Sequence, residues 1–268
     1  MSVTTMRDEM IRDLAERFFI AETTRKLIKP VIEDYPGLTF EDAYAVQLAV
    51  NEKKKALGWS IVGKKVGLTN PSVQKQRGLT EPDYGTLFDA NMLREGEPVK
   101  VSTLMCEPMI EVELAFVLKH DLSGPGVSLS QAYHAVEAVV PAFEIVECRC
   151  SPASKTVPES ICDNASCGMV MLGNKFTKID GLNLRAIGVT IEENGRYLDS
   201  ATSATVLGNP LMSLAWLANK LSRFGTQLYE GEFVMTGSVT LMHPIKTGAC
   251  YRAIFGDNIG EMSIAFVE

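Results

Sequence analysis

The pattern of apolar and polar positions divides the chain into a helical first part and a mainly β remainder. Apolar residues recur close to a 3.6-residue period over residues 5–29 and again over residues 40–56, which predicts two amphipathic helices. A turn at residues 34–37 separates them. Thr39 and Asp42 resemble a capping box for the second helix, and Leu38 stands where a hydrophobic staple would lie.

Short strand patterns dominate after the second helix. Residues 60–67 form a β-like run that contains two lysines. Residues 79–85 are rich in turn formers, and their Pro-Asp-Tyr-Gly sequence fits a β-turn. Residues 189–198 predict a hairpin, because Asn194-Gly195 suits a type I′ turn between two strand patterns.

Two further helices interrupt the strands. One is predicted at about residues 129–139, capped by Ser128, and the other at about residues 210–224, which Asn209 caps and Gly225 closes. The pattern of the final stretch, residues 232–267, predicts several strands separated by glycine.

One strand, residues 107–118, carries the most unusual pattern. Side chains on a strand alternate between its faces, so Glu111 and Glu113 project to the same side. The other side is a plausible core face, made of Ile110, Val112, Leu114 and Phe116. Two like charges on one strand face repel each other, and a divalent cation would compensate them. The alternative is that both glutamates lie on a solvated face of a half-buried strand.

A third carboxylate lies in the apolar segment 140–147. Glu144 and Glu147 face opposite sides of an extended strand, so we expect only one of them on the functional face. Three converging carboxylates would form a hard-oxygen site for Mg²⁺ or Mn²⁺. A glutamate on a solvated edge, or one paired with a cation in the core, is the alternative.

Three other places hold candidate chemistry. Alternation turns one of Lys64 and Lys65 inward, where it would need a bound anion or a lowered pKa; both can also be surface lysines. Asp83 is either a turn former or an acid–base carboxylate above a pocket. The small polar segment 162–168 is either an anion-binding loop or a plain connection.

Composition and charge narrow the classes of function. The chain has 268 residues, a formal net charge of −7 and no basic block, which argues against nucleic acid as a partner. No apolar run reaches membrane-spanning length and the N-terminal residues lack a signal-peptide core, so we expect a cytoplasmic protein without a membrane partner. The six cysteines do not follow zinc-site spacings, and no P-loop, dinucleotide fingerprint or nucleophile elbow occurs.

A set of motifs in a fixed order gives a resemblance to a known family. The motifs are Lys64-Lys-Val-Gly-Leu-Thr69, Glu81-Pro-Asp-Tyr-Gly85, Ile110-Glu-Val-Glu-Leu-Ala-Phe-Val-Leu118, Val140-Pro-Ala-Phe-Glu144, Asp163-Asn-Ala-Ser166, Leu207-Gly-Asn-Pro210 and Ala215-Trp-Leu-Ala-Asn-Lys220. Together they resemble the 2-keto-4-pentenoate hydratase family, which also contains 4-oxalocrotonate decarboxylases and belongs to the fumarylacetoacetate hydrolase superfamily.

The resemblance implies an α+β fold, with a helical N-terminal region (residues 1–75) followed by a mixed β-roll or barrel-like catalytic domain (residues 76–268). It implies a cyclic homo-oligomer, a pentamer or decamer, that can associate with a pathway decarboxylase or aldolase. It further implies that Mg²⁺ or Mn²⁺ is bound by Glu111, Glu113 and Glu144 and that Lys65 and Asp83 are catalytic. The residues expected at the substrate are Leu68, Tyr84, Asp163, Asn164 and Ser166.

The implied reaction is the addition of water to a 2-hydroxy-2,4-dienoate, giving a 4-hydroxy-2-oxo acid, in meta-cleavage degradation of aromatic compounds. Asp83 favours this hydratase branch, because the decarboxylases tend to carry an apolar residue at its position. The alternatives are 2-oxo-3-hexenedioate decarboxylation, acylpyruvate-type C–C hydrolysis and a non-catalytic partner subunit. Met109 and Asn209 depart from the basic residue and the histidine common in relatives, and near a pocket the change at Met109 would alter which substrate end-group is tolerated.

Overall fold

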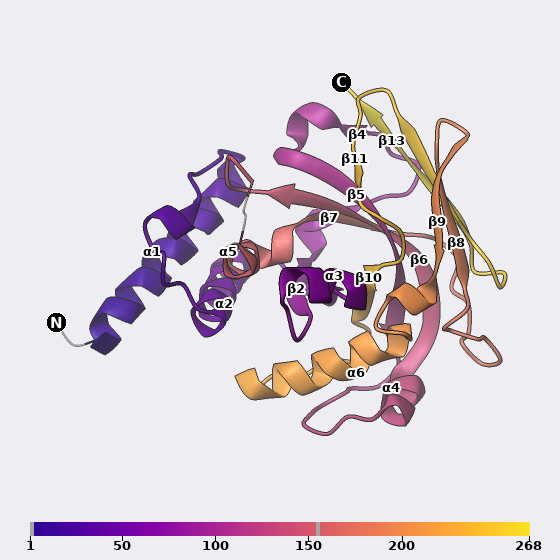
Figure 1. Ribbon diagram of the computed structural model, residues 1–268, viewed down its shortest axis with the longest axis horizontal. Coiled ribbons are helices and arrows are strands. Elements are labelled where there is room, and N and C mark those ends of the chain that lie inside the picture. The colour runs from indigo at the N-terminus through magenta and orange to yellow at the C-terminus, as the bar shows by residue number, and fades with distance from the viewer. Residues whose placement is uncertain (1–2, 154–155) are drawn as a thin grey trace.

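The protein is described by a computed structural model that covers residues 3–153 and 156–268, with side chains from residue 6 onward. Helices α1, α2 and α5 gather at one end of the molecule, and long curved strands run from there to a second sheet at the other end (Figure 1). Among the described residues, every helix is too short or too polar to span a lipid bilayer. The α-helices are α1 (Val3–Thr24), α2 (Phe40–Ala56), α3 (Pro71–Arg77), α4 (Leu129–Ala135), α5 (Val157–Cys162) and α6 (Pro210–Leu221).

The larger of two sheets curls into a half-barrel. Its order is β2-β1-β10-β5-β6-β7-β3, with β11 added beside β5. Two of its strand pairings are parallel, β1 with β10 and β3 with β7, and the others are antiparallel, so the sheet is mixed. Its strands are β1 (Ile61–Gly67), β2 (Asp83–Phe88), β3 (Met92–Leu93), β5 (Cys106–Leu118), β6 (Val136–Cys148), β7 (Cys167–Leu172), β10 (Phe233–Ser238) and β11 (His243–Pro244).

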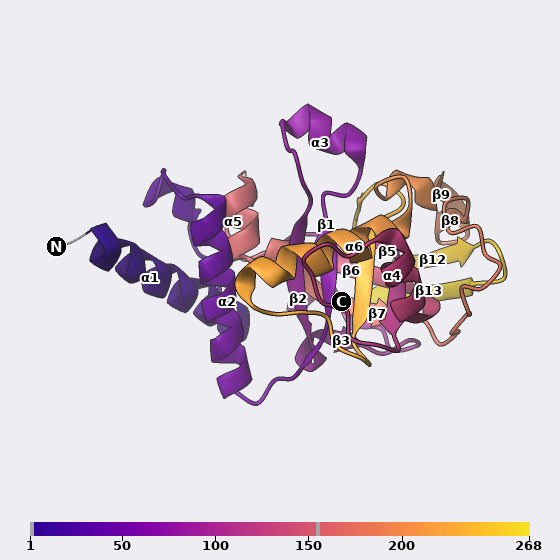
Figure 2. The same ribbon diagram turned by 90° about the horizontal axis from the view of Figure 1, so that it is seen from below.

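The second sheet packs at the far end of the molecule and has the order β4-β13-β12-β8-β9 (Figure 1). Its strands are β4 (Val99–Lys100), β8 (Gly188–Glu193), β9 (Arg196–Thr202), β12 (Cys250–Phe255) and β13 (Gly260–Val267). Helix α6 packs on β10 and α4 (Figure 2). The same view shows α3 projecting away from the rest of the chain, above the junction of helices and sheet.

The longest strands, β5 and β6, form the centre of the large sheet. They pair antiparallel in a register that sets Glu111 opposite Glu144 and Glu113 opposite Ala142. The alternate positions of β5 are fully buried in the main core, as the alternation predicted: Ile110, Val112, Leu114 and Phe116. The apolar face of this strand therefore holds the glutamate face toward the interior of the curl.

Most of the predicted elements are present. The Thr39–Asp42 capping box, the Asn194-Gly195 hairpin turn and the cap of α6 by Asn209 all occur. The helix predicted at 129–139 ends at Ala135, because the next residues join β6 as a strand that crosses the whole sheet.

Two expectations differ from the structure. Pro82-Asp-Tyr-Gly85 does not form a turn, because Asp83 begins β2, which pairs with β1 through Gly67. The boundary expected at residue 75 also assigns β1 to the helical region, whereas β1 lies inside the large sheet between β2 and β10.

Candidate active site

Three glutamates converge on the concave side of the large sheet. Carboxylate oxygens of Glu111, Glu113 and Glu144 all lie within 4.8 Å of one another. The first two stand on one face of β5, and Glu144 reaches them from the paired position of β6. Backbone alternation and strand register thus bring together what the sequence separates by more than 30 residues.

Glu113 and Glu144 are shielded from solvent, because they are 1% and 0% exposed, whereas Glu111 is half-buried. Among the described residues, Glu113 Oε1 and Glu144 Oε2 have no hydrogen-bond partner. Burial, together with repulsion from Glu144, raises the pKa of Glu111 and raises that of Glu113 well above the ordinary value. Buried carboxylate oxygens that repel one another and lack donors are a suitable ligand set for a divalent cation.

A backbone N–H group fixes one carboxylate oxygen of Glu113. The N–H of Gly237 donates to Glu113 Oε2 at 2.8 Å. Gly237 has φ +114°, and a Cβ at this position would meet Thr69 Oγ1 at 2.0 Å. Only glycine fits there, so this residue holds one oxygen of Glu113 and leaves the other one directed at the site.

Lys65 contributes a positively charged side chain to the site. Its Nζ lies 2.8 Å from Glu144 Oε1 and donates to the carbonyl of Ala165 at 2.9 Å. Burial alone lowers the pKa of Lys65, but the contact with Glu144 raises it above its ordinary value. Lys64 points to the opposite face of β1 and is buried too, 3.6 Å from Glu232, so neither lysine is the surface residue that one alternative foresaw.

Asp83 stands beside Lys65 at the start of β2. Burial raises the pKa of Asp83 to about 6, against the lowering effect of Lys65. Its Oδ1 has no hydrogen-bond partner among the described residues. A Cβ on Gly67 would lie 2.2 Å from this oxygen and 3.7 Å from Lys65 Nζ, so the bare glycine lets the carboxylate and the amine approach one point above β1.

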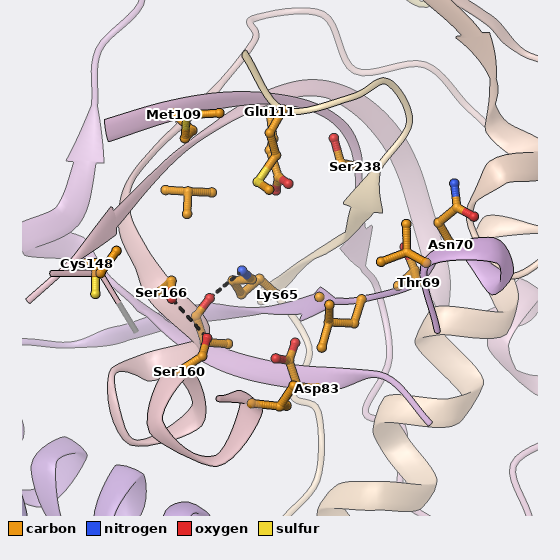
Figure 3. Close-up of a pocket in the computed structure, with 18 of the residues that line it drawn as sticks. Lys65, Thr69, Asn70, Asp83, Met109, Glu111, Cys148, Ser160, Ser166 and Ser238 are labelled. Atoms are coloured by element: carbon orange, nitrogen blue, oxygen red, sulfur yellow. Dashed lines mark hydrogen bonds between the residues drawn. The ribbon is translucent and has the colours of Figure 1, made fainter. Parts of the chain in front are cut away.

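A cavity of about 490 Å³ opens over these groups, and Lys65, Asp83 and Glu111 line it. Figure 3 shows Asp83 and Glu111 on opposite sides of Lys65. Of the residues expected at the substrate, Leu68 and Ser166 are in the lining. A cavity of this size accommodates a small organic acid.

The other three residues expected at the substrate, Tyr84, Asp163 and Asn164, lie outside the cavity lining. Their side chains make contacts within the protein. Tyr84 is buried and stacks on Tyr44 with 4.7 Å between ring centroids. Asp163 accepts the backbone N–H of Arg149 at 2.9 Å, and the Asn164 side chain bonds the main chain of Thr86 in both directions at 2.8 Å. In this structure Tyr84, Asp163 and Asn164 therefore make contacts within the protein and are not part of the cavity lining.

The segment between α5 and β7 differs from the anion-binding loop that was one expectation. Asn164, Ala165 and Ser166 adopt φ values of 55°, 53° and 58° in succession, which is an uncommon left-handed turn for residues other than glycine. The turn directs a carbonyl, that of Ala165, at Lys65. Ser166 Oγ bonds Ser160 Oγ at 2.9 Å in the cavity wall, and no spacing in the sequence indicates Ser160 (Figure 3).

Glu147 resolves the question of which glutamate of β6 joins the site. Glu144 belongs to the trio, whereas both oxygens of Glu147 accept from Arg25 Nη2 at 3.1 Å. Glu147 is fully buried, so it is the salt-bridged core glutamate that the sequence left open.

Comparison with known proteins agrees with this geometry. The sequence matches the fumarylacetoacetate (FAA) hydrolase C-terminal family over residues 45–262. The chain belongs to this family. Proteins similar to this chain include a 2-oxo-hept-4-ene-1,7-dioate hydratase of Escherichia coli, which is 37% identical over 95% of this chain and 97% of that protein. A 2-hydroxypent-2,4-dienoate hydratase of Pseudomonas putida is 36% identical over 82% of this chain and 99% of its own.

The similarity extends to a solved structure. The 4-oxalocrotonate decarboxylase from Pseudomonas putida G7, complexed with magnesium and adipate, superposes with a TM-score of 0.93 at 35% identity. The match covers 97% of this chain and 98% of that one. The family membership and the α+β fold that the motifs implied are thereby confirmed.

Proposed function

We propose that this protein is a metal-dependent hydratase of 2-hydroxy-2,4-dienoates in the degradation of aromatic compounds. The observation that carries the proposal is the buried Asp83 carboxylate. Its Oδ1 has no hydrogen-bond partner among the described residues, and it lies beside Lys65 and across the cavity from Glu111. The hydratase names of two relatives at 36–37% identity support the same reaction class.

Glu111, Glu113 and Glu144 would hold the cation, and Mg²⁺ or Mn²⁺ suits an all-carboxylate set. The magnesium bound by the similar decarboxylase supports Mg²⁺. When bound, the cation supplies Lewis-acid stabilisation of negative charge on the 2-oxygen of the substrate. The chain's own contribution is to hold the three carboxylates close together through the β5–β6 register and to fix Glu113 through the Gly237 N–H.

Lys65 and Asp83 do the proton transfers. Ketonisation moves the proton of the enol hydroxyl to C5 and leaves an α,β-unsaturated ketone. Water then adds, with its hydroxyl on C4 and its proton on C3, which gives the 4-hydroxy-2-oxo acid. Asp83, whose pKa is raised to about 6 by burial, suits proton exchange near neutral pH, and Lys65 supplies positive charge beside the developing enolate.

A second candidate function is decarboxylation of a 2-oxo-3-enedioate. It is favoured by the close superposition on the Pseudomonas putida G7 decarboxylase. The same ligand trio would serve it, because both reactions place charge on the 2-oxygen. Asp83 favours hydration, because loss of CO₂ requires no carboxylate to handle water at C4.

A paired assay tests the proposal. The purified protein with Mg²⁺ receives 2-hydroxypenta-2,4-dienoate, followed by dienol absorbance and by NMR of the product, and separately 2-oxo-3-hexenedioate, followed by CO₂ release. A 4-hydroxy-2-oxo acid without CO₂ is expected. CO₂ release from the second substrate without hydration of the first would assign the protein to the decarboxylases. Inactivity on both, with Mg²⁺ bound, would contradict both assignments.

We also propose the assembly implied by the family resemblance, a cyclic pentamer or decamer in the cytoplasm that associates with a pathway decarboxylase or aldolase. Large apolar side chains stay exposed on the single chain, among them Phe176 at 61% and Tyr197 at 67%, which supports burial against further copies. Sedimentation-velocity analysis should give a mass five or ten times the 29.3 kDa of the chain. A monomeric mass would contradict this assembly.

A further inference from the structure

Successive residue pairs of β5 and β6 that face the cavity form one of its walls, and each such pair is called a step here. Glu111, which pairs with the buried Glu144, forms the innermost step. Because residues two apart share a face, the next step outward is the pair Met109–Val146, about 6 to 7 Å further along the strands. Met109 and Val146 both line the cavity, and Figure 3 shows Met109 beside Glu111.

Three more apolar side chains extend this step. Leu241 and Met242 come from the connection between β10 and β11, which runs beside β5 because His243 pairs with Ile110. Val157, the first residue of α5, adds to it from the helical side of the cavity. We call Met109, Val146, Val157, Leu241 and Met242 the apolar shelf.

The shelf is open to a ligand. Leu241 and Met242 are 67% and 45% exposed, which is high for large apolar side chains that line a cavity. Covering this surface with hydrocarbon is favourable in proportion to the area removed from water. The shelf therefore offers binding free energy to an apolar group that begins a few bonds away from the glutamate trio.

The charges near the shelf disfavour a carboxylate there. Beyond Met109 the wall carries Glu107 and Glu147, both negative. Arg25, a described cation on this side of the site, already donates to both oxygens of Glu147. Among the described residues, the cavity lining has only Lys65 and Arg77 as cations, and neither belongs to the shelf, so a substrate carboxylate on the shelf would lose water and meet like charges.

We propose that the apolar shelf binds the far end of the substrate, so that the enzyme prefers monocarboxylic 2-hydroxydienoates with a hydrocarbon substituent at C5 over dicarboxylic ones. This inference rests on the proposed hydratase function and adds the substrate class to it. The end of the substrate that bears C1 and C2 lies at the glutamate trio, and its hydrocarbon end lies on the shelf.

Arg77 is the described residue that could instead favour a dicarboxylic substrate, because its guanidinium group could pair with a second carboxylate. It also lines the cavity, at the end of α3, and its charge lowers the pKa of Asp83, so it lies on the Asp83 side. Figure 3 shows Asp83 and Met109 on opposite sides of Lys65, so a tail on the shelf points away from Asp83. Arg77 is exposed to solvent, where an ion pair with a substrate contributes little.

The test uses two substrates of the same shape. 2-Hydroxyhepta-2,4-dienoate ends in a methyl group where 2-hydroxyhepta-2,4-diene-1,7-dioate ends in a carboxylate. With Mg²⁺ present, kcat/KM is expected to favour the methyl compound by about ten-fold or more. Met109→Arg should lower that ratio by about ten-fold or more, while Arg77→Gln should leave the ratio in place.

The matched control is Ser130→Arg, which adds the same charge at an exposed residue of α4 outside the cavity lining. It should leave the ratio unchanged. If circular dichroism shows that Met109→Arg does not fold, Leu241→Arg tests the same shelf from an exposed loop position that tolerates charge.

Equal or better turnover of the dicarboxylate by the natural protein would overturn the shelf assignment, as would its selective loss in Arg77→Gln. Hydration of 2-hydroxypenta-2,4-dienoate in the same preparation would show that the proposed function itself stands. If no dienoate is hydrated, calorimetric binding of 2-oxoheptanoate and 2-oxoheptanedioate with Mg²⁺ decides the shelf alone. Tighter binding of the monoacid is then expected, and tighter binding of the diacid would refute it.

Discussion

At the residue scale, the site depends on a few side chains whose environment differs sharply from water. Glu113 has one oxygen held by the Gly237 N–H and the other without a partner among the described residues. Asp83 is equally buried, and its neighbours are a lysine and bare backbone at Gly67. Each of these two residues can be tested by a single substitution that removes its carboxylate charge.

Glu113→Gln should leave the fold intact and lower kcat/KM by at least about 10³-fold, because a neutral amide cannot replace a charged ligand of the cation. Turnover at saturating Mg²⁺ and the thermal midpoint are the measurements. Glu137→Gln, which neutralises an exposed carboxylate of β6, is the control. Activity close to that of the natural protein in Glu113→Gln would contradict its role as a ligand.

Asp83→Ala should lower turnover by about 10² to 10⁴-fold, the usual contribution of a proton-transfer group, with much less effect on Mg²⁺-dependent binding of a 2-oxo acid. Calorimetry and steady-state kinetics separate the two effects. Asp8→Ala removes an exposed carboxylate of α1 and should change neither. Unchanged turnover in Asp83→Ala would reduce Asp83 to a structural residue at the start of β2.

At the scale of elements, a buried charge network attaches the N-terminal helices to the large sheet. Glu22 of α1 lies 2.6 Å from Lys54 of α2 and 3.7 Å from Arg149, which follows β6. Arg149 also reaches Asp163 at 3.4 Å. All four residues are at most 7% exposed, so each charge depends on its partners for compensation.

Glu22→Gln should lower the free energy of unfolding by about 3 to 5 kcal/mol, because it leaves Lys54 without its anion in the interior. The neighbouring pair Lys53–Glu16 is the matched control: it has the same charges at 2.5 Å, but its side chains are 37% and 51% exposed. Glu16→Gln should therefore cost less than about 1 kcal/mol. Urea unfolding followed by circular dichroism compares them, and equal losses would argue against the network.

At the scale of the whole molecule, the cavity lies where the helical end meets the half-barrel. Strands β1, β2, β5 and β6, helices α3 and α5 and the β10–β11 connection all contribute lining residues. The site thus exists only when the complete sheet has formed around it, and binding of the cation is coupled to the stability of the fold.

Mg²⁺ should stabilise the protein more at pH 8 than at pH 5.5. Burial raises the pKa of Glu111 and Glu113, so the metal-free folded state retains protons that the unfolded chain releases, and its stability falls as pH rises above about 4.5. The cation binds the deprotonated carboxylates and offsets that loss. At about 100 times its Kd, Mg²⁺ should raise Tm by about 5 to 10 °C at pH 8.

Differential scanning fluorimetry at matched ionic strength measures this shift. Glu113→Gln should lose most of it, since one ligand is missing. A shift of the same size at both pH values, or one that survives in Glu113→Gln, would place the cation elsewhere.

The sequence by itself determined the elements whose cause is local. The Thr39 capping box, the Asn194-Gly195 turn and the alternation of β5 each follow from neighbouring residues, and each is present. The alternation also determined that Glu111 and Glu113 share a face, because the side-chain period of a strand depends on nothing beyond the strand.

Only the tertiary structure decided how distant segments meet. The register of β5 on β6 selected Glu144 over Glu147, and a strand that begins at Asp83, rather than a turn, turned its carboxylate toward Lys65. Tyr84, Asp163 and Asn164 lie in the same motifs as the site residues, yet packing uses their side chains inside the protein. Sequence proximity to a site therefore did not predict contact with the cavity, because burial and pairing are set by contacts that are long-range in sequence.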